Sequence, residues 1–289
     1  MVTSEVSVGD ALGALRDRLD DIRLPLDAAG AEAARQVRRE SMAQLDDYVL
    51  PRLRQLDAPL LAVVGGSTGA GKSTLVNALV GRSVTATGVL RPTTRSPVLV
   101  HHPDDAGWFA DRRILPDLAR VTGGVDGGLH LVPDAGVPAG LALLDAPDID
   151  SVVGENRALA GQLLAAADLW LFVTSAARYA DAVPWDFLNA AAARSAAIAV
   201  VLDRVTPDAV DEVRTHLAGM LAGHGLGDAP LFVVGESTLD ESGQLPATAV
   251  SDVRNWLHTL AADDEARDAV VRRTLDGAIG GLVRQAPVV

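Results

Sequence analysis

The sequence contains no cysteine and only one lysine, and aromatic residues make up 3% of the chain. Without cysteine there is neither a disulfide framework nor a thiolate metal site, which suits a reducing compartment. The apolar runs are shorter than the roughly 18 residues that a membrane-spanning helix requires. The first residues also lack the basic start and apolar core of a secretion signal. We therefore expect a cytoplasmic protein.

Positive charge is scarce as well. The 25 basic residues face 38 acidic ones, which gives a formal net charge of -13. The overall field of such a chain repels phosphates, so DNA, RNA and anionic lipid surfaces are not expected as partners. Any phosphate that binds must be captured locally. Every cationic side chain except Lys72 is an arginine, so this position must require something that an arginine does not supply.

The periodicity of the apolar residues divides the chain into three regions. Steps of three and four residues predict amphipathic helices over Val8–Ile22, Val37–Leu56 and Val271–Leu282. Between them, short apolar runs alternate with helical stretches, and several runs are apolar at consecutive positions, as in strands covered on both faces. Glycine-rich turns after residue 121 predict a hairpin that joins an edge strand to the strand "LALLDA".

These patterns predict an α/β fold with a mainly parallel sheet and helices on both faces. None of the amphipathic helices can bury its apolar face alone, so the N- and C-terminal helices are expected to form a small bundle. The predicted boundaries give an N-terminal helical segment over residues 1–58, a nucleotide-binding domain over 59–245 and a C-terminal helical segment over 246–289.

The stretch "GGSTGAGKST" fits the P-loop pattern G-x-x-x-x-G-K-[ST] between an apolar strand and a helical stretch. Its glycines let the backbone curl so that N–H groups and the helix N-terminus surround a phosphate. The ammonium of Lys72 is compact enough to lie between the β- and γ-phosphates, where a planar guanidinium would be too broad. Ser73 is expected to ligate Mg2+. The predicted phosphate-binding residues are Gly66, Ser67, Thr68, Gly69, Ala70, Gly71, Lys72, Ser73 and Thr74.

A second motif follows the apolar strand "LALLDA". Asp145 ends this strand beside the P-loop strand, where its carboxylate can hold Mg2+ through water. The run Asp145-Ala146-Pro147-Asp148 resembles the D-x-P-G switch of dynamin-like and related GTPases, with Asp148 in place of the glycine. In that family the glycine N–H contacts the γ-phosphate, so the resemblance assigns Asp148 to the nucleotide site. An aspartate there is stiffer and adds a negative charge.

The resemblance implies two further regions of the site. The segment "GVLRPTTRSPVLV" stands where such GTPases carry switch I, and we prefer Thr94 to Thr93 as the residue that completes the Mg2+ shell. Arg91 and Arg95 are candidate charge stabilisers. The family's guanine-reading N-K-x-D motif is altered here. Arg204 can stack over the base, Asp203 or Asp208 can replace the missing aspartate, and Glu236 and Ser237 follow in the final base-binding loop.

Residues 60 to about 238 thus resemble a GTPase domain of the dynamin-like, septin and translation-factor-related class. The flanking helices resemble the bundle of bacterial dynamin-like proteins. Two features depart from dynamins: Thr68 stands where they have glutamine, and no lipid-binding stalk or paddle is seen. Membrane contact or a membrane-peripheral location would need segments outside this sequence.

The resemblance implies a Mg2+-dependent switch that binds GTP and GDP, with Lys72, Thr94 and Asp145 as its catalytic residues and Ser73, Thr94 and Asp145 around the metal. Hydrolysis would be slow until self-association or a related GTPase partner orders the switches. An ATPase of another P-loop class is one alternative, although an ABC ATPase would need an LSGGQ-like signature and an Asp-Glu pair that the sequence lacks. A nucleotide-binding scaffold with little hydrolysis is the other, favoured by Asp148 and the altered base motif.

Overall fold

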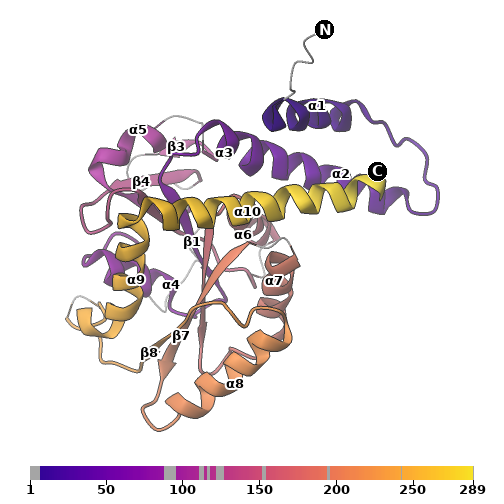
Figure 1. Cartoon of the computed structure of the whole chain (residues 1–289). Coiled ribbons are helices and arrows are strands. Elements are labelled where there is room, and N and C mark those ends of the chain that lie inside the picture. Colours follow the sequence, from indigo (N-terminus) through magenta and orange to yellow (C-terminus); the bar gives the residue numbers. More distant parts are fainter. Residues whose placement is uncertain are drawn as a thin grey trace.

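The computed structural model describes residues 7–87, 96–110, 114–115, 118–121, 127–151, 154–193, 196–241 and 243–288. Within these residues one sheet of eight strands forms the centre of the molecule (Figure 1). The strands are β1 Leu60–Gly66, β2 Val98–His101, β3 Arg120–Val121, β4 Leu129–Pro133, β5 Leu141–Asp145, β6 Leu169–Ser175, β7 Ala197–Val205 and β8 Leu231–Gly235.

The strands lie in the order β3-β4-β2-β5-β1-β6-β7-β8. Strands β5, β1, β6, β7 and β8 are parallel to one another. Strand β2 is antiparallel to β5, and β4 and β3 keep the direction of β2. The expected mainly parallel sheet is confirmed, and the five parallel strands bring their carboxyl ends to one edge.

The prediction that a hairpin joins an edge strand to β5 is wrong. Strand β4 pairs in parallel with β2, and β2 separates it from β5. The side of β5 that a hairpin would need is occupied by β2, with Val98 opposite Asp145. The loop over 134–140 therefore passes β2. Here Gly136 lies so near the end of the P-loop helix that a Cβ would be 2.1 Å from the Val80 carbonyl oxygen.

Helices cover both faces of the sheet, as the consecutive apolar positions predict. Helices α5 (Ala106–Phe109), α6 (Gly154–Ala165), α7 (Ala182–Ala193) and α8 (Val210–Gly223) pack on one face, and α4 (Lys72–Val80) and α9 (Ser251–Ala262) pack on the other. Along β1, Leu61 and Val63 belong to the first core, whereas Leu60 and Val64 belong to the second. The helices and short turns are α1 Val8–Asp21, α2 Ala31–Gln44, η1 Leu45–Val49, α3 Leu50–Arg54, α4 Lys72–Val80, η2 Pro103–Asp105, α5 Ala106–Phe109, α6 Gly154–Ala165, α7 Ala182–Ala193, α8 Val210–Gly223, η3 Ala247–Val250, α9 Ser251–Ala262, α10 Asp264–Gln285 and η4 Ala286–Val288.

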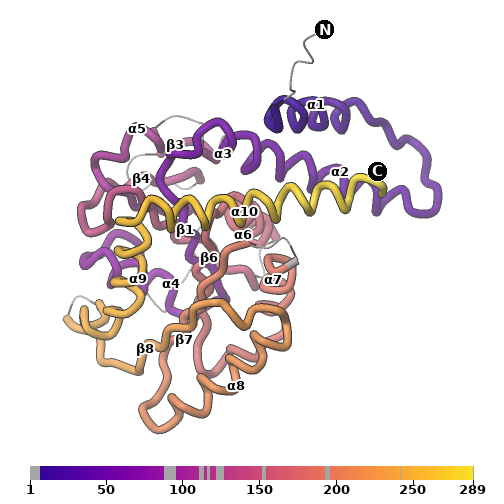
Figure 2. The backbone as a smooth tube through the Cα atoms, in the orientation of Figure 1, coloured from indigo at the N-terminus to yellow at the C-terminus, as the bar shows by residue number. Residues whose placement is uncertain are grey.

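A third core joins the N-terminal helices to α10, so the predicted bundle is confirmed. Leu12 and Leu19 of α1 and Leu45 of η1 pack in one cluster with Leu275 and Leu282 of α10. Figure 2 shows α10 beside α2, and the two helices are in contact. Helix α9 packs on the sheet instead of the bundle. The domain boundaries at 58/59 and 245/246 remain a prediction.

A buried ion pair between Arg52 and Asp168 connects the helical bundle to the sheet. Asp168 lies directly before β6 and is 2% exposed. Its carboxylate accepts hydrogen bonds from the Tyr48 hydroxyl at 3.1 Å and the Leu61 N–H at 2.8 Å, and lies 3.1 Å from Arg52 Nε. Thr274 of α10 donates to the Asp168 carbonyl at 2.9 Å. Burial raises the pKa of Asp168, and the charge of Arg52 opposes that effect.

We expect Asp168→Ala to lower the free energy of unfolding by about 3–5 kcal/mol, because it leaves Arg52 and the Leu61 N–H buried without their partner. Asp46→Ala serves as the control, since Asp46 pairs with Arg16 at the surface at 3.0 Å, where water screens the charges. Urea unfolding measures both losses. Equal losses would show that the buried joint contributes no more than the exposed pair.

Candidate nucleotide-binding site

The P-loop runs from the end of β1 to the start of α4 and requires glycine at two of its turns. Gly66 has φ +154°, and a Cβ there would lie 2.1 Å from the Val173 carbonyl oxygen of the neighbouring strand. Gly71 has φ +101°, and a Cβ there would lie 2.2 Å from Asp203 Oδ2. Gly69 is also left-handed, at φ +71°, but has no neighbour within 4 Å. The neighbouring strands β6 and β7 thus leave no room for a side chain at Gly66 and Gly71.

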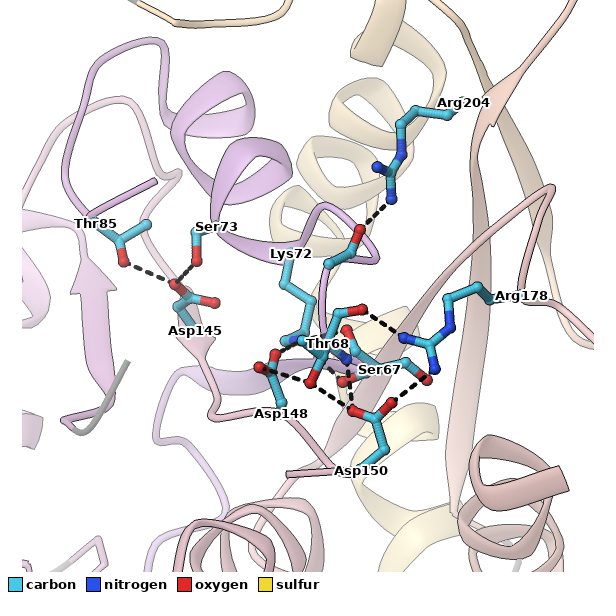
Figure 3. A network of polar contacts seen from close by, with 12 residues as sticks. Ser67, Thr68, Lys72, Ser73, Thr85, Asp145, Asp148, Asp150, Arg178 and Arg204 are labelled. Carbon is cyan, nitrogen blue, oxygen red and sulfur yellow. Dashed lines mark hydrogen bonds and ion pairs between the residues drawn. The ribbon is translucent and has the colours of Figure 1, made fainter. Parts of the chain in front are cut away.

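The ammonium of Lys72 lies inside this loop and is 5% exposed. Its Nζ donates to the carbonyl oxygens of Gly66 at 2.8 Å and Ser67 at 2.9 Å, and to Asp148 Oδ1 at 2.5 Å. An ammonium has three N–H donors, and each has a partner here. Two of the partners are neutral carbonyls, so Asp148 supplies the negative charge that balances the buried cation (Figure 3).

Asp145 is fully buried beside the first turn of α4. Its Oδ2 accepts hydrogen bonds from Ser73 Oγ and Thr85 Oγ1, each at 2.7 Å, while its Oδ1 is buried without a hydrogen-bond partner. Burial raises the pKa of Asp145, and the two hydroxyl donors and the charge of Lys72 counteract that rise. The side chain of Asn77 holds Thr85, because its Oδ1 accepts the Thr85 N–H at 3.0 Å and its Nδ2 donates to the Thr85 carbonyl at 2.9 Å.

The residues around Asp145 fit a magnesium ion. The unpartnered Oδ1 and the Ser73 hydroxyl belong to one small cluster of oxygen atoms, which are the ligands that Mg2+ prefers. In the described part of the chain no three His, Cys, Asp or Glu residues gather as a metal site. An ion held here would therefore depend on water and on phosphate oxygens, as Mg2+ in nucleotide sites commonly does.

A second network holds the tip of the P-loop. Asp150 Oδ1 accepts hydrogen bonds from the Thr68 N–H at 2.6 Å and the Thr68 hydroxyl at 2.8 Å. Arg178, in the turn after β6, donates to the Thr68 carbonyl at 2.8 Å and lies 3.2 Å from Asp150 Oδ2. Burial alone would raise the pKa of Asp150, but the Thr68 hydrogen bonds and the charge of Arg178 outweigh it and lower that pKa.

The predicted base-binding residues lie at the ends of β7 and β8. Asp203 is 7% exposed and turns toward Gly71, with its Oδ1 accepting the Arg204 N–H at 2.9 Å. Burial raises the pKa of Asp203, and the charge and N–H of Arg204 oppose that rise. Arg204 has φ +56° at a bulge in β7 and donates through Nη2 to the Gly69 carbonyl. Asp208 is exposed.

The structure gathers most of the predicted site along one edge of the sheet. The P-loop residues, Asp145, Asp148, Asp203 and Arg204 all lie there, with Thr74 half-buried in the first turn of α4. On the next strand, the Glu236 N–H donates to the Val205 carbonyl at 2.8 Å and Ser237 Oγ to the Gly235 carbonyl at 3.1 Å. The switch I residues Arg91, Thr93, Thr94 and Arg95 lie outside the described residues. Thr85, Asp150 and Arg178 are additional members of the site that no sequence motif indicates.

The model of the Dynamin family matches residues 61–115, which include the P-loop and β2. Over these residues the chain is similar to the Dynamin family. The match confirms the resemblance to the dynamin-like class on the residues that hold the phosphate-binding loop. No curated protein sequence matches the chain.

Two solved structures of an oligomerised bacterial dynamin pair, described as sensing and tethering membranes at long range, have a similar fold. They align with TM-scores of 0.54 and 0.52 at 14% and 13% identity, over 95% and 96% of this chain. At this identity the likeness concerns the fold. The aligned region spans 54% of the bacterial dynamin chains. Among the described residues, no helix combines the length and apolarity needed to cross a membrane.

Gly69 and Gly71 test the geometry of the loop. Gly69→Ala should destabilise the protein only by the strain of a left-handed side chain, about 1–3 kcal/mol. Gly71→Ala should cost more, because its Cβ would also meet Asp203 Oδ2, which Arg204 holds in place. Asp203→Ala in the Gly71→Ala background should recover part of the loss. Thermal unfolding of Gly69→Ala, Gly71→Ala, Asp203→Ala and the double variant measures this coupling, and strictly additive losses would contradict the close packing.

Proposed function

We propose that the chain is a Mg2+-dependent switch of the dynamin-like class that binds and hydrolyses GTP. The observation that carries the proposal is the buried ammonium of Lys72, balanced in the P-loop by the Asp148 carboxylate. A phosphate oxygen is the natural replacement for that carboxylate, because it brings negative charge and acceptor atoms to the same donor. The family match over residues 61–115 supports the assignment.

Each of the predicted site residues has a separate role in this proposal. Lys72 binds the β- and γ-phosphates, while the P-loop N–H groups and the first turn of α4 surround them. Ser73 and Asp145 would hold magnesium, which supplies positive charge that neutralises phosphate oxygens. In hydrolysis, water forms a bond to the γ-phosphorus and the bond to the bridging oxygen of GDP breaks, so that GDP, inorganic phosphate and a proton are released. Thr94 remains our candidate for the switch I contact.

Guanine is the base we propose. Arg204 is fixed against Gly69 next to the phosphate loop, where its guanidinium can cover a ring. Asp203, Glu236 and Ser237 lie at the neighbouring strand ends and are the candidates for reading the base edge. Self-association or a related GTPase partner is proposed to raise the rate, because the switch segments must be ordered for hydrolysis.

Competition between GTP and ATP, each with Mg2+, followed by measurement of phosphate release, tests the function. We expect GTP to compete more strongly and phosphate to be released from GTP. Preference for ATP would contradict the guanine assignment. Binding of GTP with no release, alone or at high protein concentration, would favour the second candidate, a nucleotide-binding scaffold. Asp148 in place of the switch glycine and the altered base motif support that candidate, because both depart from the pattern of the hydrolysing family.

Lys72→Arg should lose nucleotide affinity by about tenfold or more although it keeps the positive charge, because a planar guanidinium does not fit the donor positions of the ammonium. Lys72→Ala should lose at least as much. Circular dichroism checks that both variants are folded. If Lys72→Arg bound GTP like the unaltered protein, the compact ammonium would not be the feature that the loop requires.

Asp148→Gly should raise the affinity for GTP by about fivefold to tenfold, since the nucleotide no longer displaces a carboxylate that makes a charge-assisted hydrogen bond with Lys72. The fluorescence of a labelled GTP analogue measures the change. Asp104→Gly, at an exposed aspartate after β2, controls for the loss of one negative charge. Lower affinity in Asp148→Gly than in the control would show that Asp148 assists binding instead of opposing it.

A further inference from the structure

We propose that Thr68, held in place by Asp150 and Arg178, contacts the terminal phosphate and sets the preference for triphosphate over diphosphate. This inference rests on the proposed function and names three residues that do not occur together in any sequence motif. Thr68 would be the contact. Asp150 and Arg178 would be positioning residues that act through it.

The Asp148 carboxylate indicates where the terminal phosphate would lie. One of its oxygens accepts from Lys72 Nζ at 2.5 Å, and the other accepts from Thr68 Oγ1 at 3.0 Å (Figure 3). It therefore joins the P-loop cation to the hydroxyl at the loop tip. An anion that replaces this carboxylate on Lys72 arrives beside Thr68. A triphosphate has a group at that end which a diphosphate lacks.

The position of Thr68 is fixed through its backbone. Its N–H donates to Asp150 Oδ1 at 2.6 Å, and its carbonyl accepts from Arg178 Nη1 at 2.8 Å. The hydroxyl is the part that can still turn. It has one hydrogen, and both Asp148 Oδ2 and Asp150 Oδ1 lie within reach of it. A phosphate oxygen in place of Asp148 would meet the same donor.

Arg178 is held as firmly as the residue that it positions. Its Nε donates to Asp181 Oδ2 at 2.9 Å, Nη1 reaches the Thr68 carbonyl, and Nη2 lies 3.2 Å from Asp150 Oδ2. The planar guanidinium satisfies three partners at once, which a lysine ammonium on a flexible stem would not do with the same geometry. The turn itself is fixed, because the Arg178 N–H donates to the Ser175 carbonyl at 2.9 Å.

Charge gives Arg178 a second effect on the terminal phosphate. Asp150 carries a negative charge close to the position now occupied by Asp148, and Arg178 balances it. Without Arg178, the Asp150 carboxylate would repel an incoming phosphate and would lose the partner that orients it. Both consequences fall on the terminal phosphate, because Asp150 contacts the loop at Thr68 and not at the carbonyls around Lys72. Triphosphate binding should therefore suffer more than diphosphate binding.

The test measures dissociation constants of a non-hydrolysable GTP analogue and of GDP, both with Mg2+, and compares their ratio between variants. Arg178→Ala should reduce the preference for the triphosphate by about tenfold, the effect of losing charge-assisted hydrogen bonds. Arg214→Ala removes the same charge from an exposed position on α8 and should leave the ratio unchanged. Thr68→Val should reduce the preference while keeping the side-chain shape, and Thr68→Ser should retain it.

The outcomes separate this inference from the proposed function. If the unaltered protein binds neither nucleotide, the proposed function fails and this inference fails with it. If it binds both, but Arg178→Ala and Thr68→Val weaken them equally, the three residues only support the fold of the loop and the inference is overturned. Should Arg178→Ala not fold, Thr68→Val and Thr68→Ser decide the matter alone, because neither substitution disturbs the backbone bonds of Thr68.

Discussion

The site depends on one constraint, which is that a positive charge is buried at the end of a strand. Lys72 is 5% exposed, and a cation in that position is stable only when its donors are satisfied and its charge is balanced. The Gly66 carbonyl provides one acceptor and also accepts the Ile149 N–H at 3.3 Å. This hydrogen bond holds the segment after β5 against the P-loop. Because Asp148 directly precedes Ile149, its carboxylate lies next to the ammonium of Lys72.

The bundle is attached to the opposite end of the same strand. Leu61, near the start of β1, donates to Asp168, and Asp168 also contacts Tyr48 of the bundle. Gly66, at the other end of β1, begins the P-loop. A displacement of the bundle relative to Asp168 would act on a strand that five residues later becomes the phosphate loop. The fold therefore contains a short and continuous physical connection between the helices and the site.

The sequence predicts features that are local, or that an amphipathic face or a family motif implies, and it fails for other contacts between distant segments. The P-loop is identified because its glycines, lysine and serine lie within one short stretch, and several central strands because burial on both faces leaves them apolar at consecutive positions. The hairpin prediction failed because β2 pairs with β5, and this pairing joins two segments that are far apart in the chain. For the same reason Thr85, which bonds to a residue 60 positions away, and Arg178, which bonds to one 110 positions away, follow no motif.

The charges along this edge constrain how an acidic protein would hold phosphate under the proposed function. Each described cation that contacts the P-loop is already paired: Lys72 with Asp148, Arg178 with Asp150, and Arg204 with Asp203. With a net charge of -13, the chain offers no general attraction to phosphate. Under the proposed function, phosphate would therefore have to exchange with a carboxylate. Of the three pairs, only that of Lys72 is buried with its cation inside the loop, so exchange at that position changes the charge at the centre of the site. The three donors of an ammonium match the two carbonyls and the carboxylate around it, and we therefore expect that position to require a lysine.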